Sequence, residues 1–134
     1  MEQKSFTEQV AYIVQRAYGL NLKGKKHGLL ELADDIDVDG LKRRDILEFG
    51  IRLISDGTDF QYINDVLSNM INTEQDETAK RIKLIQKEAV QRIYEGISSL
   101  LLISALFSLL NSDEQNEVQE LLKDKSLSEY FSMY

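Results

Sequence analysis

Residues 77–110 read ETAKRIKLIQKEAVQRIYEGISSLLLISALFSLL, and this stretch decides the fold. Residues suited to one buried face recur through it at intervals of three or four positions: Ile82, Ile85, Ala89, Ile93, Ile97, Leu100, Ser104, Phe107 and Leu110. That spacing places them on one side of an α-helix. The pattern therefore predicts a single long helix over residues 77–110.

From Leu100 onward this predicted helix is apolar on nearly every side, which predicts self-association. A helix that is apolar all round has to be buried all round, and a chain of 134 residues has little other material to bury it. We therefore expect a homo-oligomer whose interface is formed by Ile97, Leu100, Leu101, Ser104 and Phe107. On the same ground, aspartate at Leu101 or at Phe107 is expected to disrupt the fold.

The same segment is too short to be a membrane span. Residues 97–110 would cover about 21 Å as a helix, whereas the hydrocarbon core of a bilayer is ~30 Å thick. Serines interrupt the run, and Asp113 and Glu114 follow shortly after it. We expect no membrane span in this chain.

The composition of the whole chain favours an all-α protein. It contains no proline and only 7 glycines, although a protein built of strands and turns usually has prolines in its turns. Hydrophobic residues make up 43% and charged residues 29%, as in an ordinary globular domain. We expect one domain over residues 1–134, folded as a bundle of about five to six helices.

In the rest of the sequence, helix-start patterns and apolar spacing predict further helices. Ser5 with Glu8 has the form of a capping box. The expected helices cover about 6–22, 28–36, 40–54 and 60–71 before the long helix, and two more lie within 112–134. Further capping boxes are expected at Thr58 with Gln61, Ser112 with Gln115, and Ser126 with Glu129. Gly57 suits the left-handed turn that often closes a helix.

The chain has few residues that point to chemistry. Cysteine is absent, which excludes disulfides and sulfur-ligated metals and fits a cytoplasmic protein. His27, the only histidine, lies in a basic loop, and no Ser-His-Asp set, HExxH motif or dinucleotide-binding loop is present. Asp35, Asp37 and Asp39 have the spacing of a calcium loop, but Ile46 stands where that loop needs a glutamate. We expect no catalytic residue, no cofactor and no metal.

Charge indicates which partners the chain can bind. The formal net charge of −7 argues against nucleic acid. Two local groups of basic residues, together with an aspartate near the first, form a candidate protein-binding surface: Lys25, Lys26, Asp34, Lys42, Arg43 and Arg44. The alternative interpretation is that these basic residues are solvated helix faces with acidic neighbours.

Three segments together resemble the cytoplasmic region of the flagellar motor stator subunit MotA, of the MotA/TolQ/ExbB proton channel family. They are GLLELA at 28–33, LKRRDILEFGIRLISDGTD at 41–59 and INDVL at 63–67. Their order and spacing are similar to that family over residues 10–75, and DGTD at 56–59 is the most specific piece. The family has a basic residue three positions before the glycine of GLL and an acidic residue five positions after it. Lys25 matches the first position, whereas Ala33 occupies the second, with Asp34 beside it.

The resemblance implies a function in motility. Stator subunits of this family form a ring in the inner membrane, and their cytoplasmic helices push on charged residues of the rotor switch protein. The family has four membrane spans and a proline-containing motif, and this chain has no proline. We therefore expect a free-standing, rotor-facing domain at the cytoplasmic side of the flagellar base, with the rotor switch protein or a stator subunit as its partner. The alternative is a self-associating helical adaptor or regulator unrelated to motility.

Overall fold

The computed structural model describes residues 4–42, 45–125 and 127, and over these residues the chain has eight helices and no strands. The helices are α1 (Phe6–His27), the 3-10 helix η1 (Leu29–Asp35), α2 (Val38–Lys42), α3 (Ile46–Ser55), α4 (Phe60–Asn72), α5 (Glu77–Glu95), α6 (Ser99–Phe107) and α7 (Ser112–Leu122). The all-α class is confirmed. None of the helices in the described part of the chain is both long enough and apolar enough to cross a bilayer.

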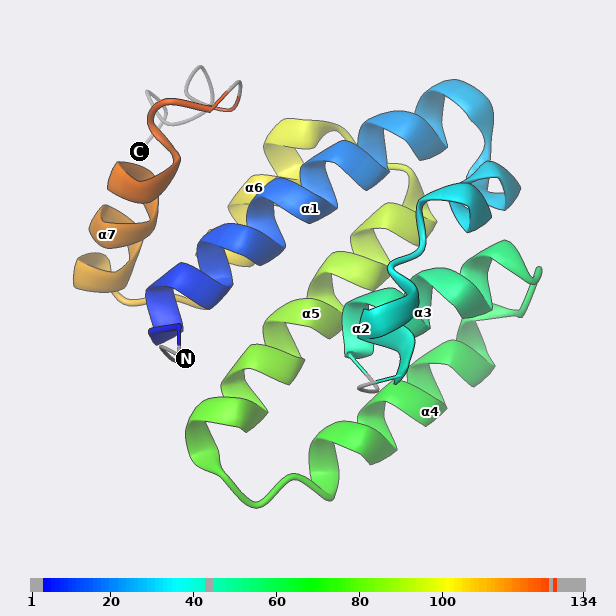
Figure 1. Cartoon of the computed structure of the whole chain (residues 1–134), viewed down its shortest axis with the longest axis horizontal. Helices are drawn as coiled ribbons and strands as arrows, with labels where there is room; N and C mark the ends of the chain where they lie inside the picture. Colours follow the sequence, from blue (N-terminus) through cyan, green and yellow to red (C-terminus); the bar gives the residue numbers. More distant parts are fainter. Residues whose placement is uncertain (1–3, 43–44, 126, 128–134) are drawn as a thin grey trace.

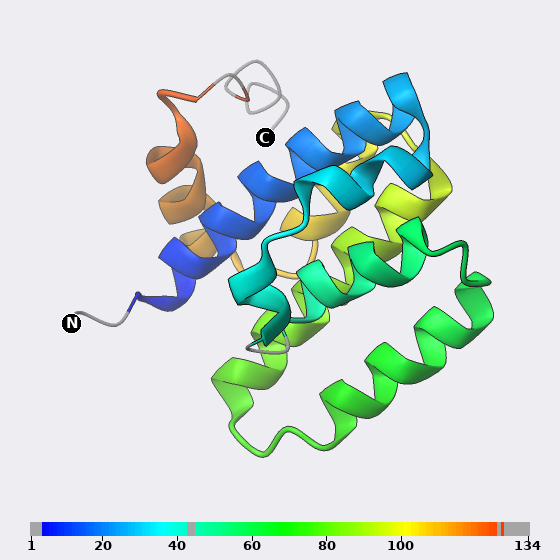
Figure 2. The ribbon, with the colours of Figure 1, turned by 45° about the vertical axis from the view of Figure 1, so that its right-hand side comes forward.

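The bundle is organised around α5. This helix packs against α1, α3, α4 and α6, and its residues Ile85, Ala89, Val90 and Ile93 are buried. Figure 1 shows α1 and α5 running alongside each other, with the α3–α4 hairpin on one side and α7 beside the first half of α1. In both Figure 1 and Figure 2, α4 lies at the outer edge of the bundle.

The predicted single helix over residues 77–110 is wrong, because the chain turns between α5 and α6. Gly96 adopts a left-handed conformation with φ +69°, and its N–H donates to the carbonyls of Arg92 and Ile93. Ser98 then begins α6, and its side chain accepts a hydrogen bond from the N–H of Leu101. The apolar spacing continues across this turn, so periodicity alone did not separate the two helices.

Other boundaries differ from the prediction for local reasons. The first helix continues to His27, and residues 29–35 form a 3-10 helix. The helix expected over 40–54 is divided, since the Asp45 side chain accepts from the N–H of Glu48 and starts α3. In the 3-10 helix, Leu32 is buried but Leu30 is exposed.

The capping predictions had mixed outcomes. The box formed by Ser5 and Glu8 is confirmed. The box at Thr58 is wrong, since Asp59 precedes α4 without a capping hydrogen bond from its side chain. At α7 the box is shifted by one residue to Asn111 and Glu114. The expected final helix falls on Ser126 and residues 128–134, which lie outside the described residues.

Charged and aromatic groups connect the first helix with the last. Arg81 of α5 donates to both carboxylate oxygens of Glu114 at 2.8 and 2.9 Å, and its guanidinium lies 4.4 Å from the centre of the Phe6 ring. The hydrogen bonds from Arg81 lower the pKa of the Glu114 carboxyl to about 2. The Thr7 hydroxyl also donates to Glu117 at 2.9 Å. Together these contacts connect α1, α5 and α7.

At Gly50, α3 packs directly against Val90 of α5. A Cβ atom at this position would lie 2.5 Å from Cγ2 of Val90, so only glycine lets α3 approach α5 this closely. Gly19 of α1 has no neighbour within 4 Å of the same hypothetical atom and serves as a matched control.

We expect Gly50→Ala to lower the free energy of unfolding by about 1–3 kcal/mol, because an extra methyl group overpacks a filled core. Gly19→Ala is expected to raise it by about 0.5–1 kcal/mol, because alanine is the better helix former. Urea denaturation of both variants measures the difference. Partial recovery in Gly50→Ala/Val90→Ala is expected, and equal stabilities of the two single variants would contradict the assigned packing.

Candidate interaction surfaces

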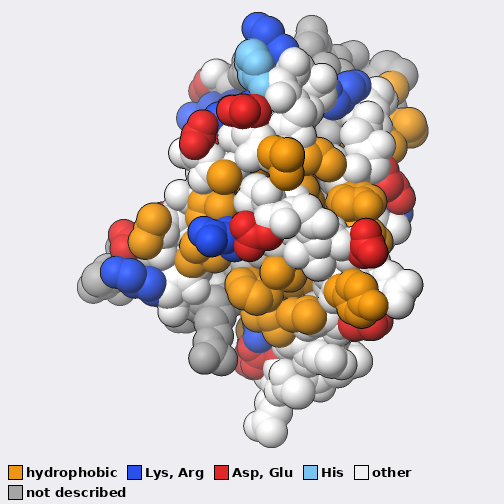
Figure 3. All heavy atoms as spheres, turned by 90° about the vertical axis from the view of Figure 1, so that its right-hand side faces the viewer, with side chains coloured by type: hydrophobic (Ala, Val, Ile, Leu, Met, Phe, Trp, Pro, Cys, Tyr) orange, Lys and Arg blue, Asp and Glu red, His pale blue; other side chains and the backbone are white. Residues whose placement is uncertain are grey.

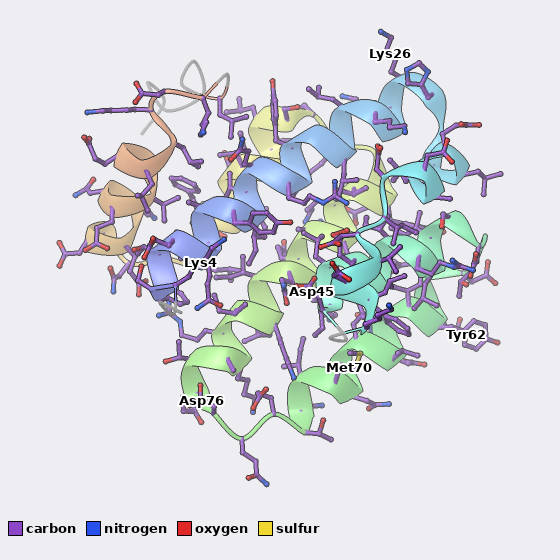
Figure 4. The ribbon with its side chains drawn as sticks, in the orientation of Figure 1. Lys4, Lys26, Asp45, Tyr62, Met70 and Asp76 are labelled. Atoms are coloured by element: carbon purple, nitrogen blue, oxygen red, sulfur yellow. The ribbon has the colours of Figure 1, made fainter. Side chains whose placement is uncertain are left out.

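The predicted partner-binding residues do not form one surface. Lys25 and Lys26 are exposed in the last turn of α1, and Asp34 is exposed in η1. Lys42 is exposed at the end of α2, whereas Arg43 and Arg44 lie outside the described residues. Figure 4 labels Lys26 at the upper end of the molecule, and Figures 1 and 2 both place α2 well below that end. We call Lys25, Lys26, Leu30 and Asp34 the tip, and Lys42 does not belong to it.

Two glycines build the tip by turning the chain back on itself. Gly28 ends α1 with φ +96°, and its N–H donates to the carbonyl of Gly24 at 2.9 Å. Gly24 leaves room for the Leu29 side chain, which would come within 3.2 Å of a Cβ atom there. Leu32 is fully buried beneath this turn, while 66% of Leu30 is exposed. An apolar side chain therefore lies on the surface close to the two lysines.

The lysines of the tip carry unpaired charge. Lys23 pairs with Asp35 at 2.9 Å, but no ion pair to Lys25 or Lys26 exists among residues 4–42, 45–125 and 127. Both lysines lie at a helix C-terminus, where the helix dipole favours positive charge. Figure 3 shows basic side chains and the histidine gathered at the upper end of the molecule. These side chains are available to an acidic group of a partner.

The strap, defined here as residues 28–42, is held to the bundle by a buried ion pair. Arg16 of α1 donates to Glu48 of α3, with Nη2 to Oε1 at 2.6 Å and Nε to Oε2 at 3.2 Å. Glu48, only 3% exposed, also accepts the N–H of Asp37 at 2.8 Å. Arg16 donates in addition to the carbonyl of Asp35. One ion pair thus joins α1, α3 and the strap that carries part of the tip.

Burial and the charge of Glu48 have opposite effects on the pKa of Arg16. Burial alone lowers the pKa of the Arg16 guanidinium, but the hydrogen bond and the charge of Glu48 raise it above its ordinary value. Burial and the nearby Glu48 carboxylate also raise the pKa of the Tyr12 phenol. Sequence reasoning missed Arg16 and Glu48, because 32 positions separate them and no motif links them.

The expected oligomer interface is divided between the core and the surface. Phe107 is fully buried within the chain and has no surface to offer a second copy, whereas 57% of Leu101 is exposed. Leu100, Ile97 and Ser104 are partly buried. A shallow groove of about 390 Å³ lies along α6, lined by Arg92, Ile97, Leu101, Ser104, Ala105 and Ser108. No residue from 97 to 112 is charged, so this α6 face is locally neutral.

Neither a metal-binding cluster nor a similar known protein indicates a function for these surfaces. In the described part of the chain, no group of three or more His, Asp or Glu side chains is arranged to hold a metal ion. Comparison with known proteins gives no match, whether to protein-family models, to curated proteins or to solved structures.

We expect Arg16→Met to destabilise the fold by about 3–5 kcal/mol, because it leaves the buried Glu48 carboxylate without its partner. Arg52→Met is the matched control, since its partner Asp56 is exposed, and it should cost less than about 1 kcal/mol. Chemical denaturation measures both, and amide exchange at Asp37 reports whether the strap has loosened. Similar losses of unfolding free energy in the two variants would show that burial does not make the Arg16–Glu48 pair more important for stability than an exposed pair.

Proposed function

We propose that this chain is a non-catalytic protein-interaction domain that binds a protein partner through the tip. The observation that carries the proposal is the presence of two exposed lysines without an ion-pair partner among the described residues, next to an exposed leucine, on a rigidly supported turn. Exposed charge beside an apolar anchor is an arrangement suited to protein recognition. A buried ion pair and two glycines hold the turn in place, so little ordering would be required on binding.

The resemblance to the MotA stator subunit supports a specific partner. The rotor-facing surface in that family combines a basic and an acidic residue, and here Lys25 and Asp34 are both exposed at the tip. Asp34 is the proposed replacement for the acidic position that Ala33 occupies. The proposed partner is accordingly the rotor switch protein or a stator subunit, on the cytoplasmic side of the flagellar base.

We expect Lys25→Glu/Lys26→Glu to abolish capture of the purified partner by the immobilised chain, because two attractive charges become repulsive. Lys4→Glu/Lys125→Glu changes the net charge equally at exposed positions outside the tip and should retain capture. Biolayer interferometry with purified rotor switch protein and with stator subunit gives the affinities. If wild-type chain retains neither protein, the motility proposal is rejected.

A second candidate function is self-association through α6. It is favoured by the exposed Leu101 beside a groove whose α6 lining, Ser104, Ala105 and Ser108, is uncharged. Copies that each carry a net charge of −7 repel one another least where their contact surface is neutral. In this proposal the chain is a self-associating adaptor, and the tip remains free for another protein.

Leu101→Asp and Phe107→Asp are expected to behave differently. Leu101→Asp should keep the melting temperature of the monomer and abolish any dimer, because position 101 is on the surface. Phe107→Asp should unfold the chain, because it places an unpaired charge in the core. Light scattering gives the mass and calorimetry the stability. A wild-type chain that is monomeric at high concentration would reject self-association.

A further inference from the structure

The net charge of the chain is concentrated in one hairpin. The segment 45–76, which contains α3 and α4, has seven acidic residues and one basic residue, Arg52, so it carries −6 of the total of −7. The acidic residues are Asp45, Glu48, Asp56, Asp59, Asp65, Glu74 and Asp76. The remaining sequence is close to neutral. We call this segment the acidic hairpin.

Several of these carboxylates already have partners. Glu48 is buried against Arg16, Glu74 pairs with Lys83 at 2.9 Å and Asp56 with Arg52 at 3.2 Å. Asp59 and Asp65 are exposed, and neither forms an ion pair with a described residue. Two carboxylates without an ion-pair partner among the described residues therefore remain, one just before α4 and one on its exposed side.

The acidic hairpin also presents an apolar stripe. Tyr62, Val66 and Met70 follow one another at intervals of four residues, so they lie along one side of α4. Tyr62 is 56% exposed and Val66 is 39% exposed, and Figure 4 shows Tyr62 projecting outward from the helix. Figure 3 shows hydrophobic side chains gathered across this face of the molecule, with acidic side chains beside them.

Tyr62 and Val66 are not part of the core of the chain, whereas Met70 at the end of the stripe is partly buried against it. The opposite flank of α4 is already occupied, because the ring of Phe60 packs against that of Tyr94 with 5.0 Å between their centres. Ile63, Leu67 and Ile71 bury the inner side of α4 in the core. The side carrying Tyr62 and Val66 thus remains an exposed apolar stripe on a surface helix at the edge of the bundle.

We propose that the acidic hairpin docks an amphipathic helix of another protein whose polar side is basic. An apolar stripe on a helix matches the apolar side of a second helix, with the anchors spaced by one turn. The unpaired Asp59 and Asp65 beside it match lysine or arginine at the margin of that helix. This surface is separate from the tip and opposite in charge, so the proposal goes beyond the function assigned above and is tested independently of it.

The negative charge of the hairpin favours a basic helix over other binding partners. A second copy would bring two hairpins of −6 together, and the uncharged α6 face is the better site for self-association. Nucleic acid and anionic membrane surfaces are repelled by the same charge. A basic amphipathic helix is the partner that can contact both the apolar stripe and the acidic residues Asp59 and Asp65 beside it.

The test uses the full chain and a labelled synthetic helix about 18 residues long, or five turns, with leucines on one side and lysines on the other. A second peptide with the same leucines and glutamates in place of lysines is the control for charge. Fluorescence anisotropy gives the affinities. We expect saturable binding of the basic peptide only, weakening as salt is added.

Protein variants locate the binding. Tyr62→Ser/Val66→Ser and Asp59→Asn/Asp65→Asn should each weaken binding about tenfold without changing the melting temperature, since these side chains are exposed. Leu22→Ser/Leu121→Ser removes equally exposed apolar groups from α1 and α7 and should have no effect. Lys25→Glu/Lys26→Glu should also leave peptide binding intact, which separates this surface from the tip.

Four results would overturn the proposal. One is the absence of saturable binding of the basic peptide up to about 1 mM, the limit of weak specific complexes. Another is an unchanged affinity in both hairpin variants, or equal binding of the acidic peptide. The last is a dimer of the chain that disappears in Tyr62→Ser/Val66→Ser, which would assign the stripe to a second copy.

Discussion

The contact between Arg16 and Glu48 is the constraint on which the arrangement of the candidate surfaces depends. Glu48 is nearly inaccessible to solvent, yet it is charged, so its position requires both the guanidinium and the N–H of Asp37. The same arginine reaches the strap through the carbonyl of Asp35. The 3-10 helix and the tip are thereby held against α1 and α3 by polar contacts, although Leu32 is the only residue of that helix to be fully buried.

The two proposed protein-binding surfaces differ because the chain separates its charges. Basic residues end α1, where the helix dipole accommodates them, while most of the net negative charge lies in the acidic hairpin, residues 45–76, largely at the ends of its helices. The neutral segment after Gly96 forms a third region. A chain organised in this way can discriminate among partners by the sign of their charge before any apolar contact is formed.

Sequence reasoning recovered the helical class and several local features, because these depend on residues close together in the chain. The Ser5–Glu8 box, the left-handed Gly57 and the apolar face of α5 are of this kind. The break at Gly96 was missed because the apolar spacing continues through it. The Arg16–Glu48 pair and the Gly50–Val90 crossing were missed because they join distant segments and leave no periodic signal. Of the expected site, Lys25 and Lys26 lie on α1 and Asp34 on the adjoining η1, while Lys42 lies on α2.

The placement of the first helix also constrains how the chain can fold. The inner face of α1 is covered by α5, α6 and α7, and Thr7 bonds to Glu117, 110 positions away. During synthesis α1 is made first, but the helices that bury Val10, Val14 and Ala17 emerge much later. Much of the apolar face of α1 therefore lacks its native packing partners until residues 77–122 have left the ribosome. The core forms late, because its helices are far apart in the sequence. The chain loses loop entropy in bringing them together before their packing contacts stabilise the fold.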